Sequence, residues 1–302
     1  MQPLIYIIIV NYNGLSDTKE CLQSLKRIKY ENYKVIVIDN NSKNNEYNIL
    51  YKHFSYKYKI IYSKNNLGFA GGYNLGIKNA LKNNADYVVL LNNDTVVGQN
   101  YIRGLLKPFS DKKIGITTSK IYYYSEKDKI WYAGANFNKF NGESRHIGLN
   151  EEDAKKYKKI YGIERASGCS MMIKKDVFNR IGFLDEKYFL TFEESDFCWR
   201  ATKDNFRILF TPKSKVWHKV SSTMVKNSPV LIYYYWRNNL FFASKFFNPL
   251  HFLVFYIYYF LKSILYIIFW IFKYKFKAKE KIKVLVKAQK DFFQNKMGKQ
   301  NI

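Results

Sequence analysis

Cysteine and acidic residues are both scarce in this sequence. The 302 residues include only three cysteines, Cys21, Cys169 and Cys198, which lie far apart and form no C-x-x-C pair. A disulfide-stapled fold and a zinc finger are therefore excluded. Apolar residues make up 47% of the chain and aromatic residues 19%, which excludes a disordered polar chain. The length fits one large domain or a domain with an appendage.

Three common sequence signals are missing. Residues 1–20 contain no secretion signal, because the apolar run Leu4–Val10 stops at Asn11-Tyr12-Asn13-Gly14. We therefore expect a reducing, cytoplasmic compartment. The sequence has no G-x-x-x-x-G-K-[ST] loop, and the turn after the first apolar run is not G-x-G-x-x-G. These absences exclude P-loop, kinase and ordinary dinucleotide-binding proteins.

The net charge of +26 indicates an anionic partner, either nucleic acid or a membrane surface. Of the 24 acidic residues, 22 lie in residues 1–220, while residues 273–302 hold ten lysines against Glu280 and Asp291. This basic segment follows a strongly apolar stretch, which favours an anionic membrane surface. We expect no nucleic-acid partner, and AT-rich codon usage accounts for part of the lysine excess.

Short apolar runs alternate with amphipathic stretches over the first 120 residues. Four runs predict strands: Leu4–Val10, Lys34–Ile38, Lys59–Tyr62 and Tyr87–Leu91. The stretches between them predict helices over residues 17–28, 44–54 and 70–82. This alternation is typical of a doubly wound α/β sheet with mostly parallel strands, in which ligands bind beyond the carboxyl ends of the strands.

The second half of the chain changes character twice. Residues 120–165 are polar and rich in tyrosine, so we expect an irregular surface excursion there. A strand is expected at Arg207–Thr211. Beyond about residue 225 the chain becomes aromatic, apolar and basic. We therefore predict a domain of residues 1–225 followed by a helical tail of residues 226–302.

Polar residues follow several of the predicted strands. Asp39 could accept hydrogen bonds from a ribose or a base, or could simply form a turn. Asp94, after Asn92-Asn93, offers hard oxygen ligands for Mg²⁺ or Mn²⁺ that substrate phosphates would complete. His218 could add an imidazole or be structural. The glycines after the third strand would either approach a ligand or pack a helix tightly; they are Gly68, Gly71, Gly72 and Gly76.

Three carboxylates lie within four residues in Glu193-Glu194-Ser195-Asp196. Like charges held together in a partly apolar setting raise at least one pKa, which suits a general base near neutral pH. The alternative is a capping cluster, because acidic residues in a first turn interact favourably with the helix dipole. One residue can be catalytic while another is structural.

Seven segments form an ordered series along the chain. They are Val10–Gly14, Asp39–Ser42, Asn66–Gly76, Leu90–Thr95, Ser167–Met171, Gly182–Glu186 and Phe192–Arg200. The series resembles the family 2 glycosyltransferases, most closely their rhamnosyltransferase-like branch, over roughly residues 4–245. The resemblance implies a GT-A fold, which is a Rossmann-like nucleotide-diphospho-sugar transferase domain. It also implies a nucleotide-sugar donor, Mg²⁺ or Mn²⁺, and inversion at the anomeric carbon.

The resemblance also implies roles for individual residues. Those placed at the donor are Asn11, Asn13, Asp39, Asn66, Gly71, Gly72, Asn74 and Asn93. Asp94 and His218 are placed at the metal, although Asn92 and Asn93 depart from the family's D-x-D motif. Glu194 stands where the family has an aspartate base, and the choice between Glu193 and Glu194 stays open. Asp196 and Arg237 are further candidates for phosphate or acceptor contacts.

The implied function is that of an inverting glycosyltransferase. It would move a sugar from a nucleotide-diphosphate donor to a hydroxyl group of a glycan or lipid-linked acceptor in cell-surface polysaccharide or glycoconjugate synthesis. The alternative is an inactive protein of the same fold that acts as a basic scaffold at the membrane surface. The sequence leaves the sugar, the nucleobase, the acceptor, the linkage and the oligomeric state open.

The tail contains an apolar stretch, residues 252–272, in which Lys262 is the charged residue. As a helix these 21 residues would be about 32 Å long, enough to span a bilayer. A lysine at mid-bilayer costs roughly 2.5–3.5 kcal/mol, and positive charge on both flanks opposes a single crossing. We expect an in-plane helix pair or a shallow re-entrant hairpin on the cytoplasmic face. The alternative is a soluble helical subdomain.

Overall fold

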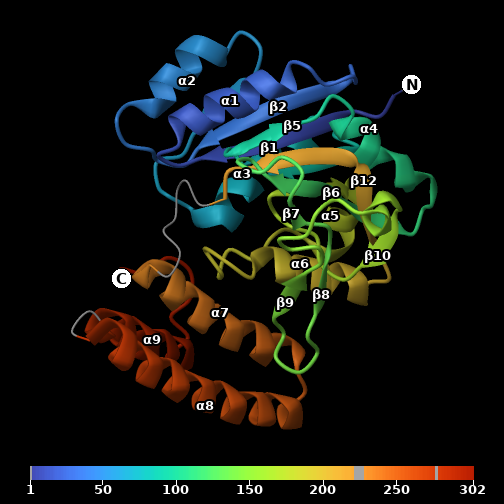
Figure 1. Cartoon of the computed structure of the whole chain (residues 1–302). Helices are drawn as coiled ribbons and strands as arrows, with labels where there is room; N and C mark the ends of the chain where they lie inside the picture. The colour runs from blue at the N-terminus through green and yellow to red at the C-terminus, as the bar shows by residue number, and fades with distance from the viewer. Residues whose placement is uncertain (1, 221–227, 276–277) are drawn as a thin grey trace.

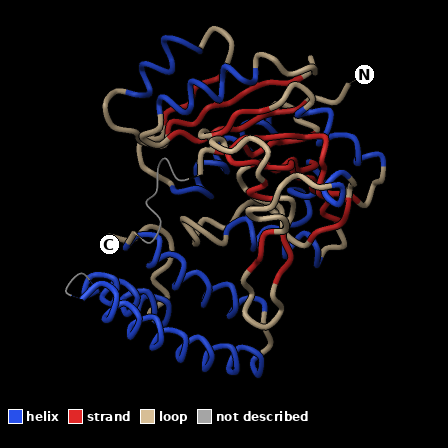
Figure 2. The backbone as a smooth tube through the Cα atoms, in the orientation of Figure 1, coloured by secondary structure: helices blue, strands red, loops and turns tan. Residues whose placement is uncertain are grey.

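The molecule consists of an α/β unit and a layer of three helices beneath it (Figure 1). The computed structural model describes residues 2–220, 228–275 and 278–302. The described strands all lie in the α/β unit, and the lower layer is helical (Figure 2).

A ten-stranded mixed sheet forms the centre of the α/β unit, in the order β10-β12-β6-β11-β4-β1-β2-β3, with β5 beside β12 and β7 beside β6. The strands are β1 Ile5–Asn11, β2 Tyr33–Asp39, β3 Lys59–Tyr62, β4 Tyr87–Leu91, β5 Thr95–Val97, β6 Ile114–Tyr123, β7 Ile130–Tyr132, β10 Tyr161–Ile163, β11 Ser170–Lys174 and β12 Arg207–His218. β1 to β4 are parallel as predicted. β6 and β12 are also parallel. However, β11 runs antiparallel to both β4 and β6, and β5, β7 and β10 are antiparallel to their neighbours, so the sheet is mixed and not mostly parallel.

Helices cover both faces of the sheet because alternate residues of its strands point to opposite sides. Ile5, Ile7 and Ile9 of β1 pack in one core, and Tyr6 and Ile8 pack in the other. The first core is covered by α1 Leu15–Leu25, α2 Glu46–Phe54 and α4 Tyr101–Leu106. The second is covered by α3 Gly68–Lys82, α5 Lys175–Ile181 and α6 Glu193–Lys203. The predicted doubly wound arrangement is confirmed.

β6 was not predicted, and its last residues, 120–123, fall in the stretch 120–165 that was expected to be irregular. The strand lies in the middle of the sheet, and its polar residues from Thr117 to Lys120 are buried. Partners distant in the sequence satisfy them: Thr118 Oγ1 donates to Ser170 O at 2.7 Å, and Lys120 Nζ pairs with Asp153 at 2.7 Å. The polar composition of this segment is therefore the reason that a core strand was not predicted there. The same region adds a small separate sheet of β8 Ala135–Phe137 and β9 Ser144–His146.

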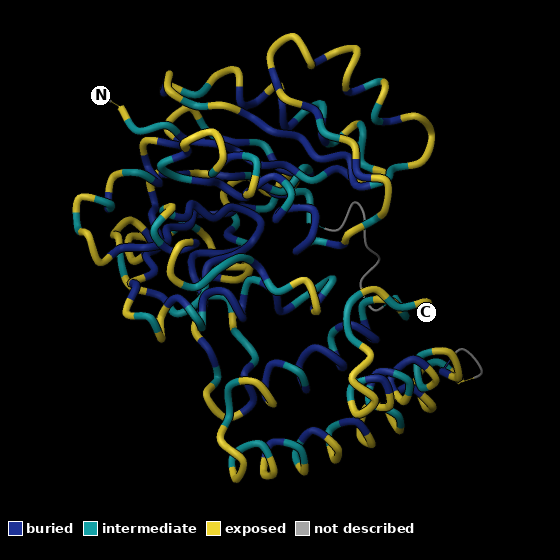
Figure 3. The backbone as a smooth tube through the Cα atoms, turned by 180° about the vertical axis from the view of Figure 1, so that it is seen from behind, coloured by how far each residue is buried: buried dark blue, intermediate teal, exposed yellow. Residues whose placement is uncertain are grey.

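The tail forms α7 Pro229–Phe246, α8 Pro249–Tyr274 and α9 Ala278–Phe293, which share a core that includes Trp236 and Tyr259. α8 lies on the outside of this layer, and exposed positions recur along its outer edge (Figure 3). Among the described helices, α8 alone is long and apolar enough to cross a membrane. The predicted domain boundary falls within residues 221–227, outside the described residues.

Candidate active site

Four of the predicted site positions lie at the edge of the sheet where its parallel strands end. β1 ends at Asn11 and β2 at Asp39, which are register partners. β4 stops directly before Asn92-Asn93-Asp94. β12 runs past the predicted end at Thr211 through a register shift, and it ends at His218 beside β5. The fold thus brings these four positions to one edge.

Asn11 is the centre of a buried hydrogen-bond network. Its side-chain amide donates to Asp39 Oδ2 at 2.8 Å and to Glu46 Oε2 at 2.9 Å. Ser42 Oγ accepts from Asn11 Nδ2 and from the main-chain N–H of Asn13, each at 3.0 Å. Asn11 and Asp39 have no exposed surface, whereas Asn13 is exposed. The network therefore fixes the shape of this edge, and Asn13 lies where solvent reaches it.

The glycines of α3 are packing residues in this structure. A Cβ atom on Gly76 would lie 2.4 Å from Ile8 Cγ2, and one on Gly72 would lie 3.0 Å from Val10 Cγ1. One on Gly71 would lie 2.7 Å from the side chain of the residue that precedes the helix. Of the two roles considered for these glycines, the structure supports tight packing of the helix.

Two asparagines hold the loops on either side of α3. Asn66 Oδ1 accepts from the main-chain N–H of Gly68 at 2.9 Å. Asn74 Nδ2 donates to Leu184 O at 2.8 Å, and its Oδ1 accepts from the N–H of the same residue at 3.1 Å. Asn74 thereby ties α3 to the loop that leads toward α6.

Asp94 and His218 are buried side by side. His218 Nε2 lies 3.1 Å from Asp94 Oδ1, and this oxygen has no hydrogen-bond partner among the described residues. Two ligands on one octahedral Mg²⁺ at about 2.1 Å are about 3 Å apart, so the pair fits a shared divalent cation. Asn93 is occupied elsewhere, since its Nδ2 donates to Thr18 Oγ1 at 3.0 Å. The described residues contain no group of three or more metal-type ligands, so a diphosphate and water would have to complete the site.

Glu193 and Glu194 begin α6, and their surroundings give them different states. Glu193 is buried, and burial together with the neighbouring charge of Glu194 raises its pKa well above the usual value. Glu194 Oε1 accepts from the Arg165 guanidinium at 2.5 Å in a largely shielded ion pair. Its Oε2 is buried and has no hydrogen-bond partner among the described residues. The protonated form of Glu193 is therefore favoured relative to that of a free glutamate, whereas Glu194 is paired with a cation.

Three side chains that the sequence analysis missed connect Glu194 to His218. Arg165 Nη1 lies 3.4 Å from His146 Nε2, and His146 Nδ1 lies 3.3 Å from Trp131 O. The rings of His146 and His218 each meet the Trp131 ring edge-on, and the centroid of each histidine ring lies 4.8 Å from the Trp131 centroid. Burial and the Arg165 charge lower the pKa of His146 to about 4, so it is neutral at physiological pH. These residues lie in or near the stretch expected to be irregular, where no periodic pattern singled them out.

Asp196 and Arg237 have other partners than those predicted. Asp196 is fully buried and pairs with Arg200 at 2.6 Å and with Lys245 at 2.5 Å. Arg237 is also fully buried, and its guanidinium donates to main-chain carbonyl groups, among them Gly298 O at 2.8 Å. The structure thus gives both residues structural partners in place of the expected phosphate or acceptor contacts.

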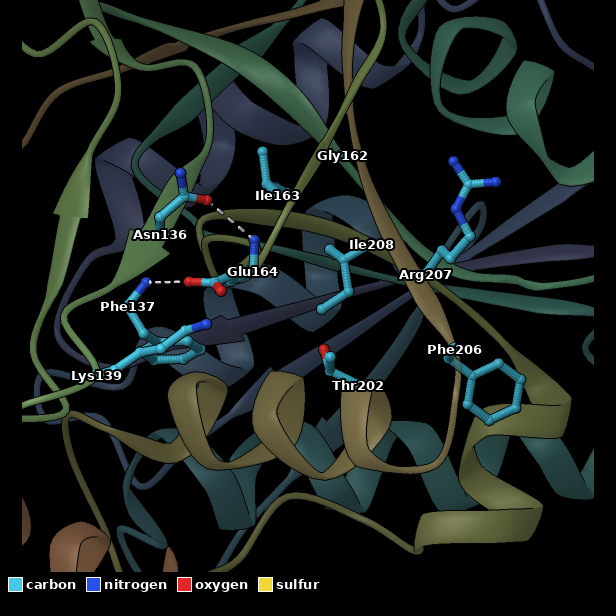
Figure 4. Close-up of a pocket in the computed structure, with 10 residues that line it drawn as sticks. All are labelled: Asn136, Phe137, Lys139, Gly162, Ile163, Glu164, Thr202, Phe206, Arg207 and Ile208. Atoms are coloured by element: carbon cyan, nitrogen blue, oxygen red, sulfur yellow. Dashed lines mark hydrogen bonds between the residues drawn. The ribbon is translucent and has the colours of Figure 1, made fainter. Parts of the chain in front are cut away.

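A separate open cavity of about 520 Å³ lies where β8 and β10 face the end of α6 and the start of β12 (Figure 4). Glu164 lies in the middle of it, where its carboxylate accepts from the main-chain N–H of Phe137 at 2.7 Å. The predicted site residues do not line this cavity. The candidate site therefore rests on the polar groups at the sheet edge and at the start of α6.

Sequence comparison relates the chain to enzymes of glycan synthesis. The family model described as "Glycosyl transferase family 2" matches residues 6–182. The low-salt glycan biosynthesis hexosyltransferase Agl10 of Haloferax volcanii is 30% identical over 206 residues, which are 67% of this chain and 62% of Agl10. The dTDP-rhamnosyl transferase RfbF of Shigella flexneri is 25% identical over 266 residues, 83% of each chain. The chain therefore spans less than two thirds of the length of Agl10.

Solved structures share the architecture. GalNAc-T7, solved with UDP, GalNAc and Mn²⁺, matches 82% of this chain and 48% of its own, with a TM-score of 0.64 and 17% identity. The mannosyltransferase PcManGT of Pyrobaculum calidifontis, solved with GDP-Man and Mn²⁺, matches 98% of this chain and 88% of its own, with a TM-score of 0.60 and 11% identity. The predicted GT-A fold is confirmed, and at these identities the likeness concerns the fold alone.

Proposed function

Because the chain belongs to glycosyl transferase family 2, we propose that it is an inverting glycosyltransferase that moves a sugar from a nucleotide-diphosphate donor to a hydroxyl group of a glycan or lipid-linked acceptor. The observation that carries the proposal is the chain of contacts between Glu194 and the Asp94–His218 pair. An inactive scaffold is not favoured, because it has no need of these shielded groups. The activities named for Agl10 and RfbF support a hexosyl or rhamnosyl donor and a role in cell-surface glycan synthesis.

Glu194 is the catalytic base in this proposal. It takes the proton of the acceptor hydroxyl, and the oxygen forms a bond to the anomeric carbon while the bond from that carbon to the diphosphate breaks on the opposite side. Arg165 fixes the carboxylate through Oε1. The raised pKa of Glu193 favours its protonated form, which cannot accept the proton of the acceptor hydroxyl. Proton transfer by a positioned base typically contributes about 10²–10⁴-fold to the rate.

Asp94 Oδ1 and His218 Nε2 would hold Mg²⁺ or Mn²⁺ together with the donor diphosphate. When bound, such an ion supplies electrostatic stabilisation of the charge that develops on the leaving diphosphate. The main chain places both ligands: Lys219 N–H donates to Asp94 O at 3.0 Å, next to the β12–β5 pairing. The Mn²⁺ reported with GalNAc-T7 and PcManGT supports a divalent cation.

The donor nucleoside lies at the sheet edge in this proposal. The Asn11–Asp39 network forms its floor, and Asn13 is available at the surface for direct contacts. The other predicted donor residues support this edge from behind through the packing and hydrogen bonds described above; they are Asn66, Gly71, Gly72, Asn74 and Asn93.

The tail, residues 226–302, would hold the enzyme on the cytoplasmic face of an anionic membrane. The outer face of α8 exposes large apolar side chains, up to 81% of Phe272. Lys262 faces the protein instead, because its Nζ pairs with Glu143 at 2.5 Å. His251, near the start of α8, contacts Phe140 O at 2.9 Å. Two attachments to the β8–β9 hairpin favour a helix that lies in the membrane plane, and the lysines that follow would attract anionic lipid.

Turnover of a panel of nucleotide sugars by the purified full chain tests the proposed activity. With Mn²⁺ or Mg²⁺ we expect one donor to release its nucleotide diphosphate, and EDTA should stop the reaction. Glu194→Gln should lower the rate by about 10² or more and spare nucleotide binding. Glu164→Gln is the matched control, because this carboxylate lies in the separate cavity. Wild-type protein that turns over no donor with either metal would contradict the proposal, and near-normal turnover by Glu194→Gln would transfer the role of base to Glu193.

A further inference from the structure

The loop of residues 185–192 presents α6 and its two glutamates to the site. Its backbone is strained, since Phe189, Thr191 and Phe192 have φ values of 61°, 65° and 72°. Positive φ is a genuine outlier for a β-branched residue such as threonine. Such conformations persist where surrounding contacts over-determine them. The loop therefore depends on neighbours to keep its shape.

Two consecutive residues of α7 supply these contacts. The side-chain amide of Asn238 donates to three carbonyl groups of the loop, at 2.9, 2.7 and 3.0 Å: those of Tyr188, Leu190 and Thr191. The Arg237 guanidinium donates to Lys187 O and Tyr188 O, each at 3.2 Å. Neither side chain has exposed surface. Five hydrogen bonds from one turn of α7 thus hold the main chain that leads into α6.

Other parts of the chain hold the same loop. The main-chain N–H of Phe69, in the first turn of α3, donates to Phe189 O at 2.7 Å. On the tail side, the N–H of Gly298 donates to Lys187 O at 2.7 Å, while Gly298 O accepts from Arg237 at 2.8 Å. The loop is therefore fixed between α3, at the proposed donor edge, and the helical tail.

We propose that Arg237 and Asn238 are positioning residues for Glu194. They hold the loop so that α6 begins with the Glu194 carboxylate directed at Arg165 and the site. This inference rests on the proposed glycosyltransferase activity and extends it: the tail belongs to the catalytic apparatus and is not only a membrane attachment. Misplacement of a catalytic group by about 1 Å can cost 10²-fold in rate.

Asn238→Ala and Arg237→Lys in the full chain test this role, with Tyr259→Phe as the matched control. Tyr259 is also buried in the tail, where its hydroxyl donates to Trp236 O at 2.8 Å without touching the loop. We expect Asn238→Ala to lower kcat about 10–100-fold and to leave the donor KM and the Mn²⁺-dependent nucleotide Kd within twofold. Arg237→Lys, which keeps the charge but loses the planar fork, should lower kcat less. Tyr259→Phe should lower the melting temperature and keep kcat.

The loop itself gives a second readout, which also serves if Asn238→Ala is too unstable and only Arg237→Lys can be measured. Hydrogen exchange should accelerate at the amides of residues 187–196 in both variants and stay unchanged in β1. If the Asn238→Ala and Arg237→Lys variants keep the wild-type kcat within twofold at temperatures well below their melting temperatures, both residues are merely structural and the inference is overturned. Absence of turnover in wild type and in Tyr259→Phe alike would overturn the proposed activity and this inference with it.

Discussion

Glu193 carries a proton in the folded protein at a pH where the unfolded chain has released it. Because its folded pKa is raised, the group costs no stability below its unfolded pKa, and stability is lost as the pH rises above that value. The loss amounts to about 1.4 kcal/mol per pH unit until the folded pKa is reached. We expect Glu193→Gln, which is permanently neutral, to melt above wild type at pH 7.5 and to lose most of this advantage at pH 4. A melting difference that is equal at both pH values would contradict the raised pKa.

Asp94 and His218 should govern metal-dependent binding and not the proton transfer. Asp94→Asn keeps the size of the side chain but weakens it as a ligand, so we expect the affinity for a nucleoside diphosphate in Mn²⁺ to fall at least about tenfold. His218→Ala should also lower the affinity for a nucleoside diphosphate in Mn²⁺. Calorimetric titration of UDP, GDP and dTDP, with Mn²⁺ and with EDTA, measures the effect. His53→Ala, an exposed histidine of α2, serves as the control. Unchanged Mn²⁺-dependent affinity in both variants would return the pair to a structural role.

At the scale of the elements, α3 can pack closely against β1 because glycine stands at the contact positions. A Cβ atom on Gly76 would lie 2.4 Å from Ile8 Cγ2, and Ile8 is fully buried and has no space to yield. We expect Gly76→Ala to destabilise the protein by about 1–3 kcal/mol in urea unfolding, as overpacking usually does. In Gly162→Ala no atom lies within 4 Å of the new Cβ, so stability should not fall. Equal effects of the two substitutions would rule out packing as the reason for Gly76.

The elements also show where sequence reasoning succeeds and where it stops. β1 to β4 and the helices between them were predictable, because their apolar periodicity is set by local burial on a two-sided sheet. β6 was not, because Thr118 and Lys120 find their partners far along the chain. For the same reason Arg165 and Trp131 were missed at the site, whereas Asp94 and Glu194 follow motifs that recur at strand and helix ends. Arg237 was named as a candidate phosphate or acceptor contact, but its main-chain partners could only be read from the fold.

For the whole molecule, the proposed membrane attachment depends on the exposed apolar face of α8. We expect the full chain to float with vesicles that contain anionic lipid and to dissociate partly in high salt, because apolar burial and lysine attraction act together. Leu261→Glu combined with Leu265→Glu, at positions 57% and 66% exposed, should abolish flotation and leave nucleotide binding intact. Tyr56→Glu, 75% exposed on the α/β unit, is the matched control. A wild-type chain that stays in the soluble fraction would favour a soluble helical subdomain.

The hydrogen bonds that join Gly298 to Lys187 and Arg237 can form only after Gly298 has been synthesised. Gly298 follows Lys187 by 111 positions, so a ribosome that adds about 5–20 residues per second needs roughly 5–20 s to pass from one to the other. During that interval the loop before α6 lacks one of its partners. α8 ends at Tyr274 and emerges earlier, so its apolar face is available to a membrane before the loop is closed. If α8 binds a membrane as proposed, the order of synthesis would let it do so before the loop that leads to Glu194 has all of its partners.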